Sequence, residues 1–179
     1  QTVWNAQHRL QGRQDSPLTP DGIRQACTMA EVLQGRGITT VCSSPLGRAL
    51  RTAVIIADGI GAELVEIPEL IEVDQGAMTG LTWAEIDEQF PGARAERAEN
   101  RYGWAFPGGE SYAQARARAR EALTASGWAS DGPPVLVSHE MIGRMLRAEL
   151  RSLSHLDALA LRHPPGVVLQ VDSPGERVL

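Results

Sequence analysis

Apolar positions along this chain alternate between helical spacing and short β-rich runs. After Thr19, apolar residues recur every three or four positions, as on a helix with one buried face: Ile23, Ala26, Cys27, Ala30 and Leu33. Thr19 and Pro20 suit an N-cap and a first helical position, and Gly35 and Gly37 suit a helix end. The pattern therefore predicts a helix that begins at Pro20 and ends before Gly35.

Three short runs predict strands: residues 39–43, 64–67 and 135–137. Ser44 suits the N-cap of a following helix whose inner face would be Ala49, Thr52, Ala53, Ile56 and Ile60. Two more helices are predicted, one over 112–126 and one marked by Ile142, Met145, Leu146, Leu150 and Leu153. Near the C-terminus, the segments 167–171 and 177–179 flank Ser173-Pro174-Gly175, which predicts a hairpin, and the sequence at 131–134 predicts a turn.

Because strands alternate with helices, the fold class predicted is a three-layer α/β/α sandwich with a mostly parallel central sheet. Residues 74–111 are less regular, with a capping box at 82–85, a break at 91–92 and a turn at 107–109. We interpret residues 1–179 as one domain with a short helical cap inserted at about 74–111. Such a cap would lie over the strand ends, where variable loops usually set specificity.

Composition narrows the classes of function. The chain has 179 residues, 42% of them hydrophobic, which is enough for a sizeable core. A net charge of −5 argues against nucleic-acid binding, and no apolar run approaches the roughly 20 residues that cross a bilayer. Cys27 and Cys42 fall in apolar patterns and are expected to be reduced core residues, so we expect a cytoplasmic protein with no nucleic-acid or membrane partner. A homodimer is left open.

Four polar or ionisable residues stand beside predicted strands or at the start of the helix after one. Asn5, Arg48, Glu72 and His139 carry an amide, a guanidinium, a carboxyl and an imidazole. In an open α/β sheet the carboxyl ends of the strands converge on the ligand crevice. These four groups together would suit phosphoryl transfer.

Arg48 and His139 are candidate phosphate ligands. A guanidinium at a helix start can hold two phosphate oxygens while the helix N-terminus adds partial positive charge, although a lone arginine is more often a surface residue. His139 follows the run 135–137, where an imidazole can donate to a phosphate oxygen, although a lone histidine more often caps a helix or sits in a core. The remaining histidines are interpreted as structural or exposed, and no spacing typical of a metal site occurs: His8, His155 and His163.

Glu72 is the candidate general acid. A leaving alcohol needs a proton, which a carboxyl with a raised pKa beside an apolar strand can supply. Glu69 and Asp74 compete with it on position alone. Glu110, in Pro-Gly-Gly-Glu-Ser, is the runner-up, although it also suits the turn before Ser111.

These motifs resemble the histidine phosphatase superfamily, also called the phosphoglycerate mutase-like family. The run 44–53 is similar to its Ser-Pro-Leu-x-Arg-Ala-x-x-Thr-Ala pattern, and 70–72, followed by Gly76 and Gly80, is similar to its Leu-x-Glu and later Gly. Trp4-Asn5 and Leu18-Thr19-Pro20-Asp21-Gly22 also match in family order. The resemblance implies the same fold, Glu72 as acid, and phosphate or substrate contacts from this set: Asn5, Gln11, Gly12, Arg48 and His139. Glu140, directly after His139, is a further candidate substrate-binding residue.

In that family an Arg-His-Gly triplet directly precedes the residue matched by Gln1, and its His is the nucleophile. The sequence contains no such triplet. We therefore predict a longer natural protein in which a central, buried strand ends in Arg-His-Gly before Gln1. We also predict that residues 1–179 alone are inactive.

The resemblance implies a cofactor-independent phosphomonoesterase that acts on a small phosphorylated metabolite through a phosphohistidine. A short cap should admit water, which favours a phosphatase, while mutase-type phosphoryl transfer and a non-catalytic phosphate-binding module stay open. Glu140 stands where the family mostly has Gly. A carboxylate roughly 6 Å from a phosphate would cost about 3 kcal/mol per unit charge at an effective dielectric near 20. We therefore expect Glu140 to point away from the phosphate, the alternative being a substrate with a cationic group.

Overall fold

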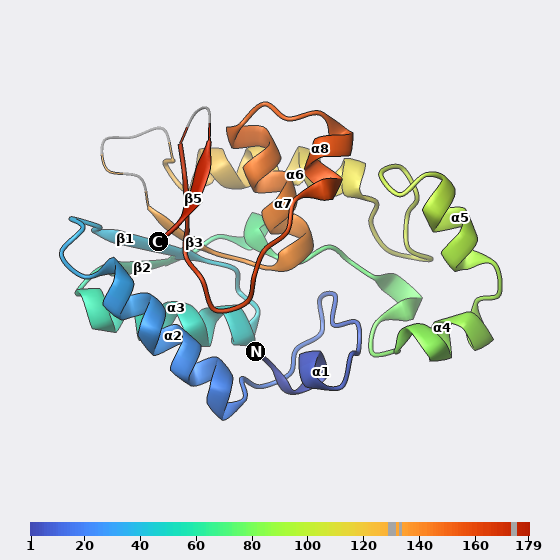
Figure 1. The fold of residues 1–179 in the computed structure, drawn as a ribbon, viewed down its shortest axis with the longest axis horizontal. Coiled ribbons are helices and arrows are strands. Elements are labelled where there is room, and N and C mark those ends of the chain that lie inside the picture. The colour runs from blue at the N-terminus through green and yellow to red at the C-terminus, as the bar shows by residue number, and fades with distance from the viewer. Residues whose placement is uncertain (129–131, 133, 173–174) are drawn as a thin grey trace.

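A computed structural model describes residues 1–128, 132, 134–172 and 175–179 (Figure 1). The helices are α1 (Val3–Ala6), α2 (Pro20–Leu33), α3 (Gly47–Ile60), α4 (Trp83–Gln89), α5 (Ala93–Glu99), α6 (Tyr112–Ala125), α7 (Glu140–Leu150) and α8 (His155–Ala160), with 3₁₀ turns η1 (Pro68–Leu70) and η2 (Gly76–Met78). The strands are β1 (Thr40–Ser43), β2 (Glu63–Glu66), β3 (Val135–Val137), β4 (Leu169–Val171) and β5 (Glu176–Val178).

Strands β1, β2 and β3 form a parallel sheet in the order β2-β1-β3. Val41 on β1 lies opposite Leu64 on β2 and Val135 on β3. Helices α2 and α3 lie on one side of this sheet and α6 and α7 on the other (Figure 1). The predicted α/β class with a parallel sheet is therefore confirmed. The predicted C-terminal hairpin is also present, with β4 and β5 antiparallel and Leu169 opposite Val178.

The ends of the helices follow mostly from local capping. Thr19 accepts the Gly22 N–H at the start of α2, and Ser111 accepts the Gln114 N–H at the start of α6. The prediction that Ser44 caps α3 is wrong: the N-cap is Leu46 and has no side-chain cap. Ser44 Oγ instead accepts the Leu46 N–H at 3.3 Å, so the hydroxyl closes a turn before the helix begins.

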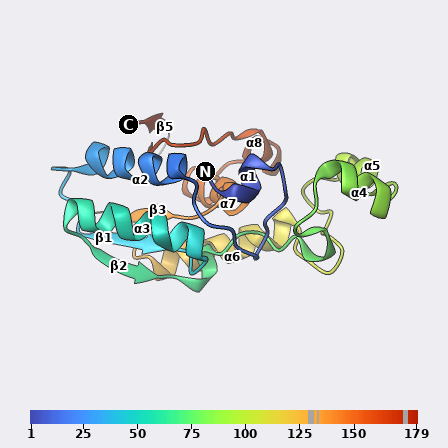
Figure 2. The same cartoon turned by 90° about the horizontal axis from the view of Figure 1, so that it is seen from below.

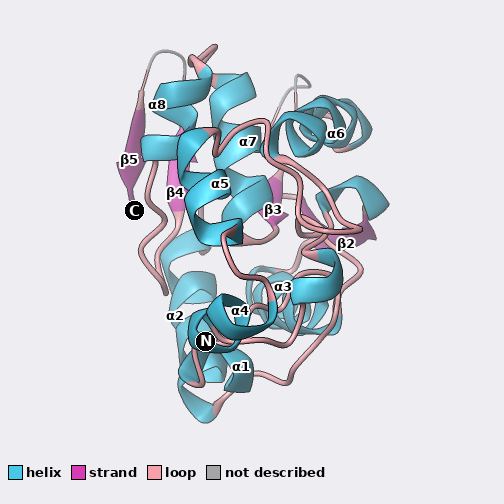
Figure 3. Ribbon diagram, turned by 90° about the vertical axis from the view of Figure 1, so that its right-hand side faces the viewer, coloured by secondary structure: helices cyan, strands magenta, loops and turns pink. Residues whose placement is uncertain are grey.

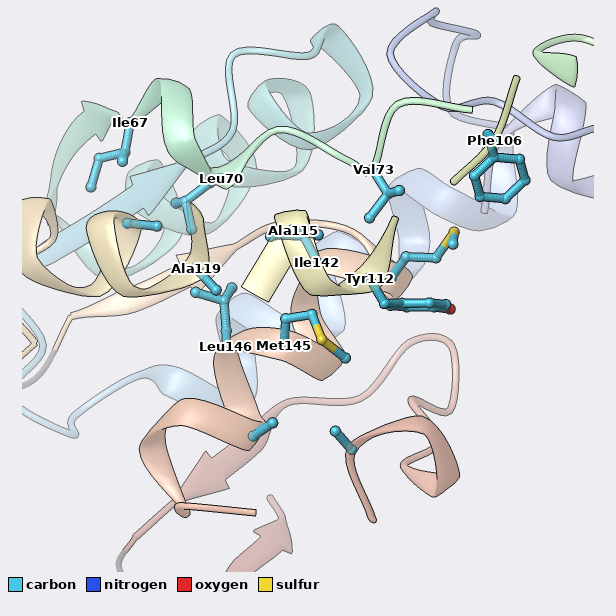
Figure 4. Close-up of a cluster of buried hydrophobic side chains, with 14 of the residues drawn as sticks. Ile67, Leu70, Val73, Phe106, Tyr112, Ala115, Ala119, Ile142, Met145 and Leu146 are labelled. Carbon is cyan, nitrogen blue, oxygen red and sulfur yellow. The ribbon is translucent and has the colours of Figure 1, made fainter. Parts of the chain in front are cut away.

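The largest hydrophobic cluster lies between η1 and the two helices α6 and α7. Figure 4 shows Ile67, Leu70 and Val73 facing side chains from those helices, with Phe106 and Tyr112 at one end of the cluster. A second cluster packs α2 and α3 against β1. Cys42 is buried as predicted, but the prediction for Cys27 is wrong, since it is exposed.

The error at Cys27 has a geometric cause. The buried face of α2 is made of small residues and one leucine: Gly22, Ala26, Ala30 and Leu33. The apolar spacing predicted a buried face that includes Ile23 and Cys27. The buried face instead runs through Gly22 and Ala26, so Ile23 is 40% exposed. Small side chains let two helices approach closely, and Gly22 itself lies against the Gln1 backbone, where a Cβ would be 2.1 Å from the carbonyl oxygen.

The two ends of segment 74–111 lie side by side and are joined by backbone hydrogen bonds. The Ala77 N–H bonds to the Pro107 carbonyl and the Glu110 N–H bonds to the Asp74 carbonyl, at 2.9 and 2.8 Å. This approach needs glycine, because a Cβ on Gly76 (φ +50°) would lie 2.1 Å from the Pro107 oxygen. Helices α4 and α5 lie at the end of the molecule beyond α1, in front of the body in Figure 3.

The carboxyl ends of β1, β2 and β3 face the same end of the molecule as α1, α4 and α5 (Figure 2). The predicted turn at 131–134 and the tip of the hairpin at 173–174 lie wholly or in part outside the described residues. None of the helices described is long and apolar enough to cross a membrane.

Candidate active site

His139 and Ser44 meet where two neighbouring strands end. Strand β1 pairs with β3 so that Ser43 lies opposite Val137, and the Ser44 N–H donates to the Val137 carbonyl at 3.0 Å. Because of this register, the residues that follow β1 and β3 also lie side by side. His139 Nε2 lies 2.8 Å from Ser44 Oγ. The sequence placed His139 at this edge of the sheet, but the partner hydroxyl follows only from the register.

The environment of His139 keeps its imidazole neutral at pH 7. Burial lowers the pKa of His139 well below the ordinary value of 6.5, and the positive charges of Arg48 and Arg118 lower it further. A neutral imidazole has one donor and one acceptor nitrogen. An anion bound nearby would favour the protonated form, so anion binding and proton uptake by His139 are coupled.

Glu72 lies under the start of helix α7. Its Oε1 accepts the Val73 and Ile142 N–H groups at 2.9 and 3.0 Å, and its Oε2 accepts the Met141 N–H at 3.1 Å. Two of these donors belong to the first turn of α7, which begins directly after His139. The carboxyl thus binds the N-terminus of the helix that follows His139, although Glu72 and α7 are far apart in sequence.

The pKa values separate Glu72 from the runner-up Glu110. Burial raises the pKa of Glu72 above the ordinary 4.5, although its three N–H bonds and the charge of Arg48 oppose the rise. For Glu110, burial alone would raise the pKa, but hydrogen bonds from Arg118 and the Asp74 N–H, with the charges of Arg118 and Arg13, outweigh it and lower the pKa. A proton donor needs a raised pKa, so Glu72 is the better candidate.

Arg48 is buried in the first turn of α3 and faces the loop 12–15. One terminal nitrogen donates to the Gln14 carbonyl at 2.5 Å and to Asp15 Oδ1 at 3.2 Å, and the other donates to the Gly12 carbonyl at 2.9 Å. A guanidinium has five N–H groups, so among the described contacts two are left for a ligand. Arg48 also influences the pKa of both Glu72 and His139, which places its charge near the two groups.

The other predicted ligands differ in their distance from this centre. Gly12 contacts Arg48 directly, and buried Gln11 accepts a hydrogen bond from Ser16 at 3.2 Å. Asn5 is exposed, and its Oδ1 accepts the Thr2 N–H in the capping box of α1. None of the hydrogen bonds among the described residues joins Asn5 to Arg48, Glu72 or His139.

Sequence reasoning missed Arg118, which holds the segment that leads to Glu72. Its guanidinium donates to the carbonyls of Glu69 and Ile71 at 2.7 and 2.6 Å, and to Glu110 Oε2 at 2.8 Å. The signal was available, because Arg118 stands on the buried face of α6, three and four positions from Ala115 and Ala122. A polar residue on an apolar stripe indicates a buried hydrogen-bond partner.

Glu140 is exposed and lines a cavity of ≈ 450 Å³, where its carboxylate pairs with Arg144. Its charge is thus compensated by a cation one turn further along the same helix. The other three histidines are exposed, and His155 stacks on Tyr102 with ring centroids 5.2 Å apart. Over the part of the chain that the structure describes, no three His, Cys, Asp or Glu side chains are grouped to hold a metal ion.

Comparison with known proteins gives one family and several close relatives. The model of the histidine phosphatase superfamily (branch 1) matches residues 1–178. Proteins named "Probable phosphoglycerate mutase GpmB" match from Cronobacter sakazakii (39% identity over 142 residues, 79% of this chain) and Yersinia pestis (36% over 159 residues, 88% of this chain). The chain spans 66% of the first relative, slightly less than two thirds, and 74% of the second.

Among solved structures, the mycobacterial glucosyl-3-phosphoglycerate phosphatase in complex with VO3 is similar, with a TM-score of 0.81 and 34% sequence identity. The match covers 100% of this chain and 92% of that one. YhfR of Bacillus stearothermophilus has a TM-score of 0.84 at 28% identity, and the match covers 99% of this chain and 90% of that one.

Proposed function

The chain belongs to the histidine phosphatase superfamily (branch 1), and from that premise we propose that it is a phosphomonoesterase for a small phosphorylated metabolite, working through a phosphohistidine. The observation that carries the proposal is the convergence of Arg48, Glu72 and His139. Burial raises the pKa of the carboxyl, while a guanidinium and a neutral imidazole lie near it. A positive charge and a proton donor are what the hydrolysis of a phosphate ester needs.

The first step is transfer of the phosphoryl group to a histidine. In the family pattern this histidine precedes the residue matched by Gln1. Its nitrogen forms a bond to phosphorus while the bond from phosphorus to the ester oxygen breaks, and Arg48 and His139 stabilise the equatorial oxygens. Glu72 gives its proton to the leaving alcohol. The proton can be carried by Oε2, because Oε2 accepts only one described N–H hydrogen bond, whereas Oε1 accepts two.

In the second step water attacks phosphorus and the bond to the histidine nitrogen breaks. Glu72, now a carboxylate, takes a proton from the water, so that phosphate leaves and the starting protonation state returns. The three N–H groups that bind Glu72 stabilise this ionised form. One carboxyl can therefore serve both steps, because burial favours its acid form and the helix N-terminus favours its base form.

Hydrolysis is preferred to mutase-type transfer. Relatives named as mutases are covered to 66% and 74% of their length, and three solved structures of one phosphatase are covered to 92%, 80% and 80%. Segment 74–111 contains two helices of seven residues each, which agrees with a short cap that admits water. Retention of the phosphohistidine in water, with transfer to a second alcohol, would favour the mutase alternative.

The test is turnover of p-nitrophenyl phosphate and of alkyl phosphates by the full-length natural protein. Arg48→Ala should reduce kcat/KM by about a hundredfold or more, because one transition-state donor is removed. Arg36→Ala, at an exposed position beyond the end of α2, is the matched control and should leave turnover unchanged. Wild-type activity in Arg48→Ala would refute the proposal.

The same assay on residues 1–179 alone tests the predicted need for an upstream histidine. We propose that this shorter chain is inactive. Phosphatase activity in the shorter chain would rule out a nucleophile before Gln1. Phosphate binding without turnover by the longer protein would instead support a non-catalytic phosphate-binding module.

A further inference from the structure

Helix α3, which carries Arg48, is capped by a residue from another part of the chain. Its N-cap residue, Leu46, has no side-chain cap, but the Arg48 N–H in the first turn donates to Asp15 Oδ1 at 3.2 Å. Asp15 belongs to the loop 12–15 and precedes Arg48 by 33 residues. Its carboxylate therefore does the work of a local cap, and its negative charge suits the positive end of the helix.

The same carboxylate oxygen also binds the guanidinium of Arg48. One terminal nitrogen of Arg48 donates to Asp15 Oδ1 at 3.2 Å, so a single oxygen is bonded to the backbone and to the end of the side chain of one residue. The carbonyls of Gly12 and Gln14 accept two further bonds from the guanidinium. Three acceptors of one loop thus fix the orientation of the N–H groups that are left for a ligand.

Burial of Arg48 makes a charged partner important. The Arg48 side chain is 8% exposed and that of Asp15 is 40% exposed. Burial lowers the pKa of Arg48, and the hydrogen bond and charge of Asp15, together with the charge of Glu72, oppose this change. A buried charge is strongly unfavourable without a partner, so Asp15 helps to keep the guanidinium charged where it lies.

The backbone on either side of Asp15 is held by hydrogen bonds. The Gln14 N–H donates to the Gln11 carbonyl at 3.0 Å, which closes a turn before Asp15. Ser16, directly after Asp15, is 5% exposed. Its Oγ accepts the Trp4 N–H at 3.1 Å and donates to Gln11 Oε1 at 3.2 Å. The exposed carboxylate of Asp15 therefore extends from a well-anchored segment.

Gly47 leaves room for the second oxygen of Asp15. A Cβ on Gly47 would lie 2.4 Å from Asp15 Oδ2, which is much closer than two such atoms normally approach. Gly47 is the first residue of α3, and its φ is outside the left-handed region, so its backbone conformation does not itself require glycine. The place of the Asp15 carboxylate is thus a reason for glycine at this position.

We propose that Asp15 is a positioning residue, which holds the Arg48 guanidinium in the orientation that binds the phosphate, and that Gly47 keeps the place of its carboxylate open. The inference rests on the proposed phosphomonoesterase function. Asp15 contacts Arg48 and acts through it. Because every ester presents the same phosphate group to Arg48, loss of Asp15 should slow good and poor leaving groups alike, unlike the loss of a proton donor.

The first test replaces Asp15 in the full-length natural protein. Asp15→Ala should lower kcat/KM by about tenfold for p-nitrophenyl phosphate and for an alkyl phosphate, and weaken inhibition by vanadate about tenfold, because the guanidinium is present but no longer oriented. Asp15→Asn keeps an oxygen that accepts both N–H groups, so it should stay within about threefold of wild type. Asp58→Ala removes the same charge from an exposed position about 15 Å further along α3, and this matched control should change neither quantity.

Gly47→Ala tests the geometry without removing Asp15. Alanine favours a helix over glycine, so a position with no link to Arg48 would gain stability and keep its activity. We expect the added Cβ to displace the Asp15 carboxylate. The lost cap should then offset the gain in helix propensity, so that Tm stays within about 2 °C of wild type while kcat/KM falls about tenfold. In the Asp15→Ala background, Gly47→Ala should lower kcat/KM no further, because the carboxylate that it displaces is absent.

The outcomes separate this proposal from the proposed function. Wild-type kcat/KM and vanadate inhibition in Gly47→Ala or in a folded Asp15→Ala, or losses that multiply in the double variant, would overturn the positioning role and leave the phosphatase intact. No turnover of any ester by the wild type would overturn the proposed function. The side-chain N–H signals of Arg48 in NMR spectra would then decide the positioning role by themselves. They should shift in both single variants, and unchanged signals would overturn it.

Discussion

Replacement of Glu72 by Gln tests the candidate acid and its structural role in one variant. The Glu72 carboxyl has three backbone N–H donors around it, two on Oε1 and one on Oε2. A protonated carboxyl still accepts all three bonds, because its O–H can use the free position on Oε2. A Gln side chain cannot, since its amide nitrogen carries two hydrogens and would face an N–H donor.

The loss of stability follows from that geometry. With the amide nitrogen in the place of Oε2, the buried Met141 N–H loses its acceptor, and an unsatisfied buried group costs about 1–3 kcal/mol. In a domain of this size each kcal/mol lowers Tm by about 2–4 °C, so Glu72→Gln should lower Tm by about 2–12 °C.

The contribution of Glu72 to the stability of the fold should depend on pH. Because burial raises the pKa of Glu72 in the folded state, its contribution to stability is complete below the unfolded value of 4.5 and decreases as pH rises toward the folded pKa. The difference in Tm between wild type and Glu72→Gln should therefore shrink from pH 4.5 upward. Glu110→Gln is the matched control with the opposite sign. The pKa of Glu110 is lowered, so its contribution is present above 4.5 and lost in acid.

The assay of the acid role uses two leaving groups. Glu72→Gln should slow an alkyl phosphate by about a hundredfold to ten-thousandfold and p-nitrophenyl phosphate much less, because nitrophenolate needs little protonation. Glu110→Gln should slow both substrates alike. Equal losses on both esters in Glu72→Gln, together with an unchanged Tm, would refute both roles of the carboxyl.

Substitutions at three positions test the surroundings of the site. Arg48→Lys should weaken inhibition by vanadate about tenfold or more, because an ammonium cannot bond to the Gly12 carbonyl and also present two parallel N–H groups to an oxyanion. Ser44→Ala should change the chemical shifts of the His139 ring nitrogens in NMR and lower kcat with little change in KM, and unchanged shifts would contradict the contact. Arg118→Met should raise the pKa of His139 in an NMR titration, because one positive charge is removed, and Arg118→Lys should restore it.

The sequence by itself determined most of the elements and their order. Helix α2 begins where Thr19 and Pro20 indicated, and the capping box at 82–85 is present, because capping depends on residues within one turn. Strand β3 covers the predicted residues 135–137. The motifs around Arg48, Glu72 and His139 also identified the family, since their spacing is a property of the chain alone.

Only the tertiary structure decided which side chains meet. The hydrogen bond between Ser44 and His139 depends on the register of β1 with β3, and the position of Glu72 under α7 depends on how the segment after η1 packs against that helix. The exposure of Cys27 depends on which stripe of α2 meets α3.

The cavity of ≈ 450 Å³ that Glu140 lines combines residues from α4, α5, α6 and α7, which no local pattern relates. Local hydrogen bonds and apolar spacing act within a few residues, whereas burial, charge and hydrogen-bond satisfaction depend on segments that only the folded chain brings together.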